Sequence, residues 1–309
     1  MLSTGLNIED LSVTFQLPSQ TVRAVDGVTV QFPAGRITGL IGESGCGKSV
    51  LGMAALGLLP PYAHVSGSFS LDGEALTERG AREKLGTVIG FIPQNPSESL
   101  NPARTVHAHL KEALLPLHLK GKSRRHRAEE LLTAFGFSEP ARILPAYPHE
   151  LSGGMQQRVL CAIGTACSPR WILADEPTKG LDRHLREQVQ DTLLSLRKQG
   201  VESMIVITHD LPLAHALCDD LAVMYAGQIV EQGTCVLTRP LHPYTQAFLD
   251  ALPENGFQPM HGIAPRVGER LLGCPFAPRC PKCSARCLKQ LPPATVTEDG
   301  RMVRCYLYE

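Results

Sequence analysis

The fold is decided by the stretch Ile37-Thr38-Gly39-Leu40-Ile41-Gly42-Glu43-Ser44-Gly45-Cys46-Gly47-Lys48-Ser49. Its first five residues form a short apolar run that is typical of a strand and leads directly into a glycine-rich loop. Residues 48–59 favour a helix, which the prolines at 60 and 61 would end. A strand, a glycine loop and a helix in this order are the context that the phosphate-binding pattern G-x-x-x-x-G-K-S requires. The stretch therefore predicts a site for nucleotide phosphates.

The residue types of this loop suit triphosphate chemistry. Glycines let backbone N–H groups turn inward and cradle phosphate oxygens. Lys48 can neutralise the β- and γ-phosphates, and the Ser49 hydroxyl can coordinate Mg²⁺. The residues expected to bind ATP here are Gly42, Glu43, Ser44, Gly45, Cys46, Gly47, Lys48, Ser49 and Val50.

Strand-like and helix-like segments alternate along the chain. Residues 6–15 and 22–32 have the alternating, β-branched pattern of strands. Further strands are expected at 68–71, 88–92, 171–174, 204–208, 221–225 and 228–231, and further helices at 106–119, 125–135 and 183–199. This alternation implies an α/β core with a mainly parallel sheet, which a helical insert interrupts.

Polar side chains follow three of the apolar strands. Asp175 can hold Mg²⁺, and Glu176 stands where it could polarise or deprotonate the attacking water. Gln94 could ligate Mg²⁺ or the water, and His209 could hydrogen-bond the γ-phosphate. The expected catalytic residues are Lys48, Gln94, Glu176 and His209, and the expected Mg²⁺ ligands are Ser49, Gln94 and Asp175.

A second glycine-rich stretch lies between the loop and the strand that ends at Asp175. It consists of Leu151, Ser152, Gly153, Gly154, Met155 and Gln156. Ser152 is a natural N-cap for the helix that follows, so the glycines would lie at an exposed helix N-terminus. Such a terminus can hold a phosphate that another subunit presents. A chain with both the phosphate-binding loop and this helix N-terminus is suited to bind ATP between itself and a partner subunit.

Composition limits the class of protein. The 309 residues are 43% apolar and carry a formal net charge of zero. They therefore lack the excess of positive charge that would indicate binding to nucleic acid. The first ten residues do not resemble a signal peptide, and residues 50–59, the longest apolar segment, are too short to cross a bilayer. We therefore expect a soluble, cytoplasmic protein that would serve a membrane only through a partner.

Ten cysteines are present, and their distribution is uneven. Five are scattered and are expected to be small buried or tolerated residues. The other five lie close to the C-terminus: Cys274, Cys280, Cys283, Cys287 and Cys305. In a cytosolic chain a metal or cluster site is favoured over disulfides there. Surrounding prolines indicate a loop-rich module that is held by its metal rather than by an apolar core.

At this point the motifs carry a resemblance to a family. The phosphate loop, Gln94, the stretch 151–156, Asp175-Glu176-Pro177-Thr178, Leu181-Asp182 and His209 occur in the order found in ABC transporter ATPases. The resemblance implies an α/β P-loop NTPase (RecA-like) core with an antiparallel β subdomain and an α-helical subdomain at about 97–168. The ATPase domain would span 1–240, and a small Cys-rich extension would span 241–309.

The resemblance also implies roles. Two such ATPases would form a head-to-tail dimer, in which residues 151–156 face the γ-phosphate bound to the partner. Phe15 matches the aromatic residue that stacks on adenine, with a core strand residue as the alternative. Asp182 matches the aspartate of a loop that crosses the interface. The sequence departs from the family at Lys179-Gly180, where Ser-Ala usually stands before Leu-Asp.

The C-terminal part is similar to one subgroup, the ATPases of dipeptide, oligopeptide and nickel importers. The similarity rests on residues 99–102, 241–246 and 273–280. It implies that Cys274, Cys280, Cys287 and Cys305 hold a [4Fe–4S] cluster. Four thiolates also fit tetrahedral Zn²⁺, and Cys283 could replace one of them as a ligand. Thiols without any ligand are the third alternative.

The expected function is that of an ATP-hydrolysing importer motor on the cytoplasmic face of the membrane. Its partners would be a second, related ATPase chain, two transmembrane permease subunits and an extracytoplasmic solute-binding protein. The cargo could be a dipeptide, an oligopeptide, nickel or a metallophore. One alternative is a soluble ABC ATPase of the translation or DNA-repair type, which usually has tandem domains or a long coiled-coil insert. Another is a weakly catalytic sensor.

Overall fold

The computed structural model describes residues 4–18, 20–197, 200–252, 256–266, 268–269 and 271–309. The chain divides into two compact units. The first unit consists of Met1–Arg82 and Thr208–Glu309, and the second consists of Glu83–Ile207. The phosphate-binding loop and the whole C-terminal part thus belong to the same unit.

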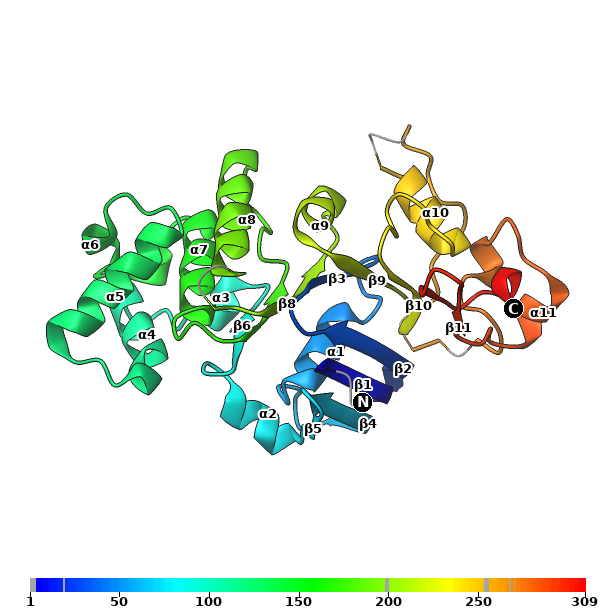
Figure 1. Ribbon diagram of the computed structural model, residues 1–309, viewed down its shortest axis with the longest axis horizontal. Coiled ribbons are helices and arrows are strands. Elements are labelled where there is room, and N and C mark those ends of the chain that lie inside the picture. Colours follow the sequence, from blue (N-terminus) through cyan, green and yellow to red (C-terminus); the bar gives the residue numbers. More distant parts are fainter. Residues whose placement is uncertain (1–3, 19, 198–199, 253–255, 267, 270) are drawn as a thin grey trace. The chain divides into compact units, whose positions relative to one another are not determined.

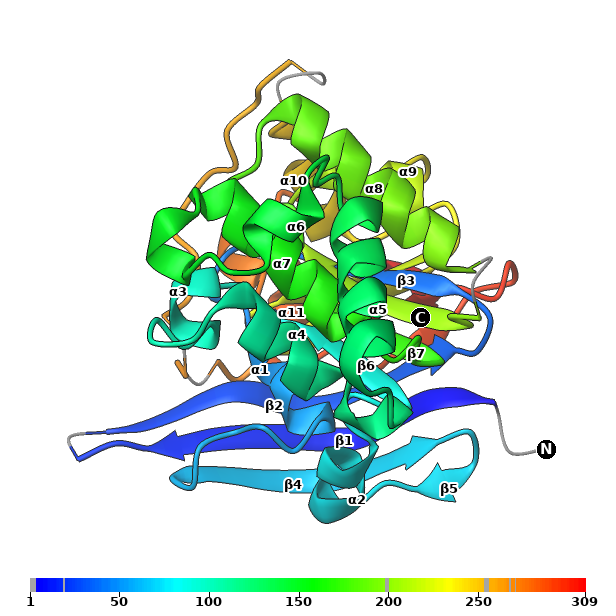
Figure 2. The ribbon, with the colours of Figure 1, turned by 90° about the vertical axis from the view of Figure 1, so that its left-hand side faces the viewer.

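An antiparallel sheet forms the N-terminal part of the first unit. Its strands are β1 (Gly5–Gln16), β2 (Thr21–Pro33), β4 (Ala63–Leu71) and β5 (Glu74–Ala75), in the order β2-β1-β4-β5. The long strands β1, β2 and β4 lie side by side in Figure 2. Apolar side chains of β1 and β2, such as Val13 and Val25, are fully buried. The antiparallel β subdomain that the family resemblance implied is present.

The first unit also contains strands of the second sheet. They are β3 (Ile37–Ile41), β9 (Asp220–Tyr225), β10 (Gln228–Gly233), β11 (Thr295–Val296) and β12 (Met302–Val303). β3 runs parallel to β9, whereas β9, β10, β12 and β11 pair antiparallel in that order. Ala226 and Gly227 form the turn of the β9–β10 hairpin, both with positive φ.

The first unit also contains helices. They are α1 (Lys48–Ala55), α2 (Glu78–Lys84), α9 (Leu211–Leu217), α10 (Pro243–Asp250) and α11 (Ala285–Lys289), with 3₁₀ turns at Ala277–Arg279 and Tyr306–Tyr308. Figure 1 places α10, in yellow, next to β9 and β10. The helix predicted at 48–59 ends at Ala55, because Gly57 has a positive φ of 65° and the Leu58 N–H donates back to the Met53 carbonyl oxygen at 2.9 Å.

The C-terminal residues share the apolar core of the first unit. Tyr244 and Phe276 are at most 1% exposed and pack in one cluster with Ile41, Val223 and Tyr225. The segment that follows residue 250 is loop-rich, as predicted. The expectation that it lacks an apolar core is wrong, because the Phe276 ring packs edge-on against the rings of both Tyr225 and Tyr244, at centroid distances of 5.4 and 5.5 Å.

A buried charged pair also ties the end of the chain to the sheet. Glu231 on β10 is fully buried, and its carboxylate accepts hydrogen bonds from the backbone N–H groups of Leu241 and His242, both at 2.9 Å. The guanidinium of Arg301 lies 3.8 Å from this carboxylate and is 5% exposed. Burial raises the pKa of Glu231. These contacts fix residues 241–242 and 301 against β10.

The second unit combines parallel strands with a group of helices. β6 (Ile89–Ile92), β7 (Trp171–Asp175) and β8 (Ser203–Thr208) are parallel neighbours in that order. The helices are α3 (Pro96–Ser99), α4 (Val106–Ala113), α5 (Gly121–Ala134), α6 (Pro140–Ile143), α7 (Gly153–Gly164) and α8 (Arg183–Arg197). Figures 1 and 2 both show α4, α5, α6 and α7 packed together. The predicted helical insert is therefore present.

The other predicted helices also differ in extent from the observed ones. The helix predicted at 125–135 begins earlier, at Gly121, and ends at Ala134. The helix predicted at 106–119 ends at Ala113, and a 3₁₀ turn, Leu115–Leu117, follows because Pro116 has no N–H to continue the helix. The helix predicted at 183–199 is observed to Arg197, and residues 198 and 199 lie outside the described residues.

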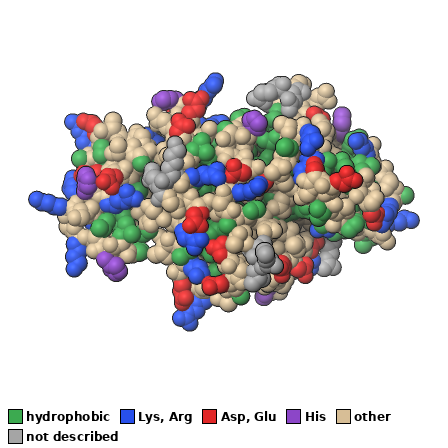
Figure 3. Space-filling model, in the orientation of Figure 1, with side chains coloured by type: hydrophobic (Ala, Val, Ile, Leu, Met, Phe, Trp, Pro, Cys, Tyr) green, Lys and Arg blue, Asp and Glu red, His purple; other side chains and the backbone are tan. Residues whose placement is uncertain are grey.

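Surface charges of both signs are interspersed on the face drawn in Figure 3. On α5, for example, Arg125 pairs with Glu129 at 2.9 Å and Arg127 with Glu130 at 3.2 Å. Among the helices of the described residues, none is both long and apolar enough to cross a bilayer.

Candidate functional site

The phosphate-binding loop connects β3 to α1 in the first unit. β3 is buried along its whole length, and α1 starts at Lys48. Gly42 and Gly47 have φ values of 152° and 108°. A side chain at Gly42 would collide with the carbonyl oxygen of Met224, and a Cβ at Gly47 would lie 2.5 Å from the Ala24 carbonyl oxygen. The loop can take this form only with glycine at both positions.

Lys48 lies inside the loop. Its ammonium donates to the carbonyl oxygens of Gly42 and Glu43, both at 2.9 Å, and the residue is 7% exposed. Cys46 is buried beside it, and burial raises the pKa of this thiol. Ser44 and Gly45 are exposed at the tip, and Ser49 and Val50 are half-buried. A cation is thus held where phosphate oxygens would meet the backbone N–H groups of the loop.

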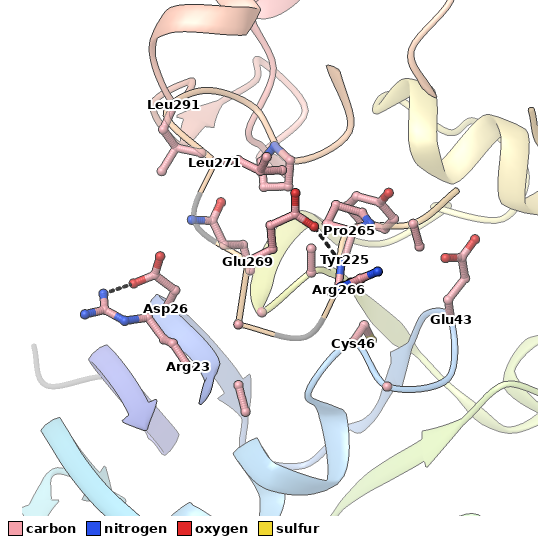
Figure 4. A pocket seen from close by; sticks show the side chains of 18 of the residues that line it. Arg23, Asp26, Glu43, Cys46, Tyr225, Pro265, Arg266, Glu269, Leu271 and Leu291 are labelled. Carbon is pink, nitrogen blue, oxygen red and sulfur yellow. Dashed lines mark hydrogen bonds and ion pairs between the residues drawn. The ribbon is translucent and has the colours of Figure 1, made fainter. Parts of the chain in front are cut away.

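A pocket of about 160 Å³ adjoins the loop. Figure 4 shows Glu43 and Cys46 on one side and Arg266 and Glu269 of the C-terminal extension on the other. The Glu269 carboxylate accepts a hydrogen bond from the Arg266 N–H at 2.9 Å. Arg23 and Asp26 of β2, which form an ion pair with each other, complete the wall. Sequence reasoning did not find this side of the pocket, because nothing local marks residues 264–266, 268, 269 and 271 as neighbours of the loop.

Phe15 lies near the end of β1. It is half-buried, whereas Val13 on the same strand is fully buried. Its ring centre is 6.1 Å from that of Tyr62, with the ring planes inclined by 55°. One part of the ring is therefore available to a planar ligand.

The second unit brings Gln94, Asp175 and Glu176 to one edge of its parallel strands. Ile92, the last residue of β6, is the register partner of Ala174 of β7. Gln94 follows the end of β6, and Asp175 is the last residue of the neighbouring strand β7. Asp175 and Glu176 are each 5% exposed. The carboxyl ends of parallel strands are the usual place for ligands in α/β proteins.

Glu176 has an unusual backbone conformation. Its φ is 49°, and its N–H donates to the Ile207 carbonyl oxygen at 2.8 Å. A positive φ in a residue other than glycine is a strained conformation that clusters at functional sites. His209 directly follows β8 in the chain and is exposed. The Thr208 hydroxyl accepts from the Asp210 N–H at 3.0 Å, and Asp210 caps α9.

The stretch 151–156 forms the start of α7. Ser152 is the N-cap, and its hydroxyl accepts from the Met155 N–H at 3.3 Å, as predicted. Leu151 is buried, but Ser152 and Gly153 are exposed, and a Cβ at Gly153 would meet nothing within 4 Å. The Gln156 amide donates to the carbonyl oxygens of Pro148 and Leu151. The N-terminus of α7 is thus open around Gly153, and the Gln156 hydrogen bonds hold the preceding residues in place.

The side chain of Arg158 anchors α7 to the end of α5. The buried Arg158 guanidinium donates to the carbonyl oxygens of Phe135 and Gly136 at 3.2 and 2.8 Å and lies 4.3 Å from the centre of the Phe137 ring. Burial lowers the pKa of Arg158. Asp182, at the start of α8, accepts from the Leu185 N–H at 3.0 Å.

Four of the five C-terminal cysteines line one cavity of about 180 Å³. They are Cys274, Cys280, Cys287 and Cys305. Cys283 is exposed and is not among the residues that line this cavity. All ten cysteines fall within the described residues and are free thiols. The structure thus groups the same four cysteines that the family resemblance implied.

The cavity thiols differ in their electrostatics. Burial raises the pKa of Cys274 to about 11 and also raises the pKa values of Cys280 and Cys305. Burial also acts on Cys287, but hydrogen bonds from Ser284 outweigh it and leave the Cys287 pKa below its ordinary value. Within the described parts of the chain, no three His, Cys, Asp or Glu side chains are close enough together to bind a single metal ion.

The comparisons with known families agree with these observations. The family described as ABC transporter matches residues 25–179, and the family described as oligopeptide/dipeptide transporter, C-terminal region, matches residues 230–287. The dipeptide transport ATP-binding protein DppD of Escherichia coli K12 is 39% identical over 97% of this chain and 96% of its own length. The oligopeptide transport ATP-binding protein AppD of Bacillus subtilis 168 is 37% identical over 100% and 98%.

Solved structures are similar in fold. The dimeric ATP-binding cassette MJ0796 in a post-hydrolysis state, bound to ADP and Pi, superimposes with a TM-score of 0.67 at 26% identity. The match covers 74% of this chain and 98% of that one. The structure of cbiO1 from Clostridium perfringens, described as part of the ABC transporter complex cbiONQ, matches with a TM-score of 0.60, also at 26% identity, over 76% of this chain and 90% of that one.

Fold and loop together define an ATP-binding protein of the P-loop class. Similarity over nearly the whole chain narrows this class, and the chain belongs to the family of ABC transporter ATPases. Its enzymatic activity is ATP hydrolysis, and membership of this family implies ATP and Mg²⁺ as ligands.

Proposed function

We propose that this chain is the ATP-hydrolysing subunit of an importer for peptides. The observation that carries the proposal is the C-terminal match at residues 230–287 to the oligopeptide/dipeptide transporter region. Relatives in Escherichia coli and Bacillus subtilis, similar over nearly their whole lengths, are described as dipeptide and oligopeptide transport proteins. A nickel cargo has no such support, so peptide is the cargo we favour.

In this proposal the first unit binds the nucleotide. The Lys48 ammonium would leave the carbonyl oxygens of Gly42 and Glu43 for the β- and γ-phosphate oxygens, which carry more negative charge. Backbone N–H groups of residues 44–49 would donate to the same phosphates. Phe15 would stack on the adenine ring. The half-buried position of this ring supports that role, because stacking needs an accessible face.

Residues at the strand ends would carry the hydrolytic chemistry. Ser49, Gln94 and Asp175 supply a hydroxyl, an amide and a carboxylate, which are oxygen donors that suit Mg²⁺. When bound, Mg²⁺ would neutralise charge on the phosphates. The Glu176 carboxylate would take a proton from the attacking water, and the His209 imidazole would hydrogen-bond the γ-phosphate and orient that water. The strained backbone of Glu176 supports a functional role for this residue.

We further infer that ATP is bound between two ATPase chains. Ser152, Gly153 and the rest of the stretch 151–156 would meet the γ-phosphate of the partner, and Asp182 would lie in the interface loop. The open helix N-terminus supports this inference, as does similarity to a cassette whose structure is described as dimeric and bound to ADP and Pi. The partner would be a related chain, which makes the pair a heterodimer.

The remaining partners follow from import across a membrane. Two permease subunits would form the channel, and a solute-binding protein on the far side would deliver peptide. The chain would lie on the cytoplasmic face of the membrane, held by the permeases. The helical subdomain at 97–168 would lie within an ATPase domain of 1–240. It would transmit the closing and opening of the ATPase dimer to the permease subunits. Residues 241–309 would form the extension.

We propose a [4Fe–4S] cluster as the ligand of the cysteine cavity. Four thiolates fit either such a cluster or a single Zn²⁺ with sulfurs at about 2.3 Å, and the family resemblance favours the cluster. A cluster spreads its four thiolates around a larger body, which suits four cysteines around a cavity of about 180 Å³. The bound cluster would stabilise the loops that carry Cys274, Cys280, Cys287 and Cys305.

Transport by the complete complex tests the proposal. The chain, its partner ATPase and the permeases would be reconstituted in lipid vesicles, and uptake of labelled di- and tripeptides would be compared with uptake of Ni²⁺. We expect ATP-dependent peptide uptake that Glu176→Gln abolishes and that the exposed control Glu139→Gln leaves unchanged. Uptake of Ni²⁺ without peptide uptake would contradict a peptide importer. ATP hydrolysis without transport of either cargo would favour the alternative of a soluble ABC ATPase.

A further inference from the structure

The C-terminal extension reaches the phosphate-binding loop through a buried cation. The Arg279 guanidinium donates to both carboxylate oxygens of Glu43 at 3.2 Å and to the Tyr225 hydroxyl, also at 3.2 Å. Its Nε donates to the His261 carbonyl oxygen at 3.1 Å. The Arg279 side chain is 7% exposed, and that of Glu43 is 27% exposed. This guanidinium is therefore held on several sides and cannot easily turn to another partner.

A second residue of the extension holds the backbone of the same loop position. The Tyr244 hydroxyl accepts a hydrogen bond from the Glu43 N–H at 3.0 Å. Tyr244 is fully buried on α10, where its ring packs 4.4 Å from the ring of Tyr225. The third polar group of Glu43, its carbonyl oxygen, accepts from the Lys48 ammonium at 2.9 Å. The partners of the Glu43 carboxylate and of its N–H thus come from the extension, whereas its carbonyl oxygen is bonded within the loop, by Lys48 and by the Cys46 N–H at 3.3 Å.

The charge of Glu43 makes these contacts relevant to nucleotide binding. A carboxylate in a loop that receives a triphosphate repels it, and the repulsion grows with the charge of the nucleotide. Arg279 supplies the opposite charge at hydrogen-bond distance and is too buried to be screened well by salt. The loop is then shaped by groups that lie more than 200 positions away in the sequence.

We propose that Arg279 and Tyr244 are positioning residues of the nucleotide site. Arg279 neutralises and fixes the Glu43 carboxylate, and Tyr244 fixes the Glu43 N–H, so that the loop is ready for phosphate before ATP binds. The inference rests on the proposed role of residues 42–50 in ATP binding. It makes the extension a part of the nucleotide site, because both residues belong to the extension and contact the loop. Arg279 also directly precedes Cys280, which lines the cysteine cavity.

The test is a set of affinities measured on the full chain. Dissociation constants for ADP and for a non-hydrolysable ATP analogue would be determined by calorimetry. We expect Arg279→Gln to weaken binding of the ATP analogue about tenfold and of ADP less, because the carboxylate left unneutralised repels the higher charge more. Adding Glu43→Gln to Arg279→Gln should restore affinity to within about threefold. Tyr244→Phe should weaken both nucleotides severalfold through the loss of one hydrogen bond.

Two controls separate the possible failures. Arg142→Gln removes an exposed arginine of the second unit and should change neither affinity. Lys48→Ala should abolish binding, and if it does not, the assignment of the phosphate loop fails and the proposed function with it. If Lys48→Ala abolishes binding while Arg279→Gln has no effect, only the present inference fails.

The double variant separates positioning from a purely structural role. If Arg279→Gln and the double variant bind equally poorly and unfold at the same lowered temperature, Arg279 only anchors the extension and the inference is overturned. Rescue by Glu43→Gln, with equal losses of thermal stability in both variants, would support it.

Discussion

Gly47 shows how one residue determines the geometry of the phosphate loop. A Cβ at this position would lie 2.5 Å from the Ala24 carbonyl oxygen, and φ is 108°. We expect Gly47→Ala to displace the loop and to weaken ATP binding at least tenfold. The matched control is Gly35→Ala, which has a positive φ of 77° but open space around its Cβ. This control should cost about 1 kcal/mol in unfolding free energy and leave ATP affinity intact.

His242 should make stability depend on pH. It is 1% exposed, its Nδ1 accepts from the Tyr244 N–H at 3.0 Å, and burial lowers its pKa to about 4. The unfolded chain, with an ordinary histidine pKa of about 6.5, therefore binds the proton more readily. The neutral side chain contributes stability above about pH 6.5, and this contribution falls as the pH drops toward 4.

Denaturant titrations at pH 7 and pH 5 would check this expectation. The wild type should lose about 2 kcal/mol of unfolding free energy through His242 over this range. His242→Asn keeps an N-cap acceptor but does not titrate, so it should lose much less. The buried Glu231 nearby has a raised pKa and acts in the opposite sense, but it is present in both proteins. Equal losses in the two proteins would contradict the role of His242.

Sequence reasoning succeeded where function depends on local pattern. The loop 42–50, the strand-end residues Asp175 and Glu176, and the N-cap Ser152 each belong to a short motif with a physical reason for its spacing. Arg279 and Tyr244 were missed, because their partner Glu43 lies 236 and 201 positions away. Such pairs depend on how distant elements pack, which no local pattern records.

At the scale of elements, α7 depends on Arg158. This residue is 8% exposed, donates to two backbone carbonyl oxygens at the end of α5 and lies over the Phe137 ring. Arg158→Met keeps the length of the side chain but leaves those carbonyls without their donor. We expect a loss of about 2–3 kcal/mol in unfolding free energy.

Chemical denaturation of the full chain would measure this loss. The control is Arg125→Met on α5, which removes an exposed i,i+4 ion pair and should cost less than about 0.5 kcal/mol. A similar cost for both variants would mean that α7 does not depend on Arg158 as described.

The elements themselves were predictable to different degrees. β3 was predicted with its observed bounds, because an apolar run before a glycine loop leaves few alternatives. The helices α9 and α10 were missed. Each is only seven or eight residues long and has a proline in its first turn, so the apolar repeat is too short to stand out from loop residues.

At the scale of the whole molecule, the cysteine cavity should hold iron. Anaerobically purified protein is expected to contain about four iron and four sulfide per chain, with absorption in the visible range. Cys280→Ser should lose most of this iron, because Cys280 lines the cavity, whereas the exposed Cys283→Ser should retain it. One zinc per chain without colour, or equal loss in both variants, would contradict the assignment.

The central claim is that two such ATPase chains close on ATP and that Glu176 then drives its hydrolysis. The most direct measurement is the mass of the purified ATPase pair by light scattering, with and without ATP, alongside the rate of phosphate release. With Glu176→Gln we expect phosphate release to fall by about 10²–10⁴ and ATP to trap the dimer. Adding Ser152→Ala, which removes the N-cap hydroxyl of α7, should prevent trapping. A Glu176→Gln chain that hydrolyses ATP at the normal rate and stays monomeric would contradict the account.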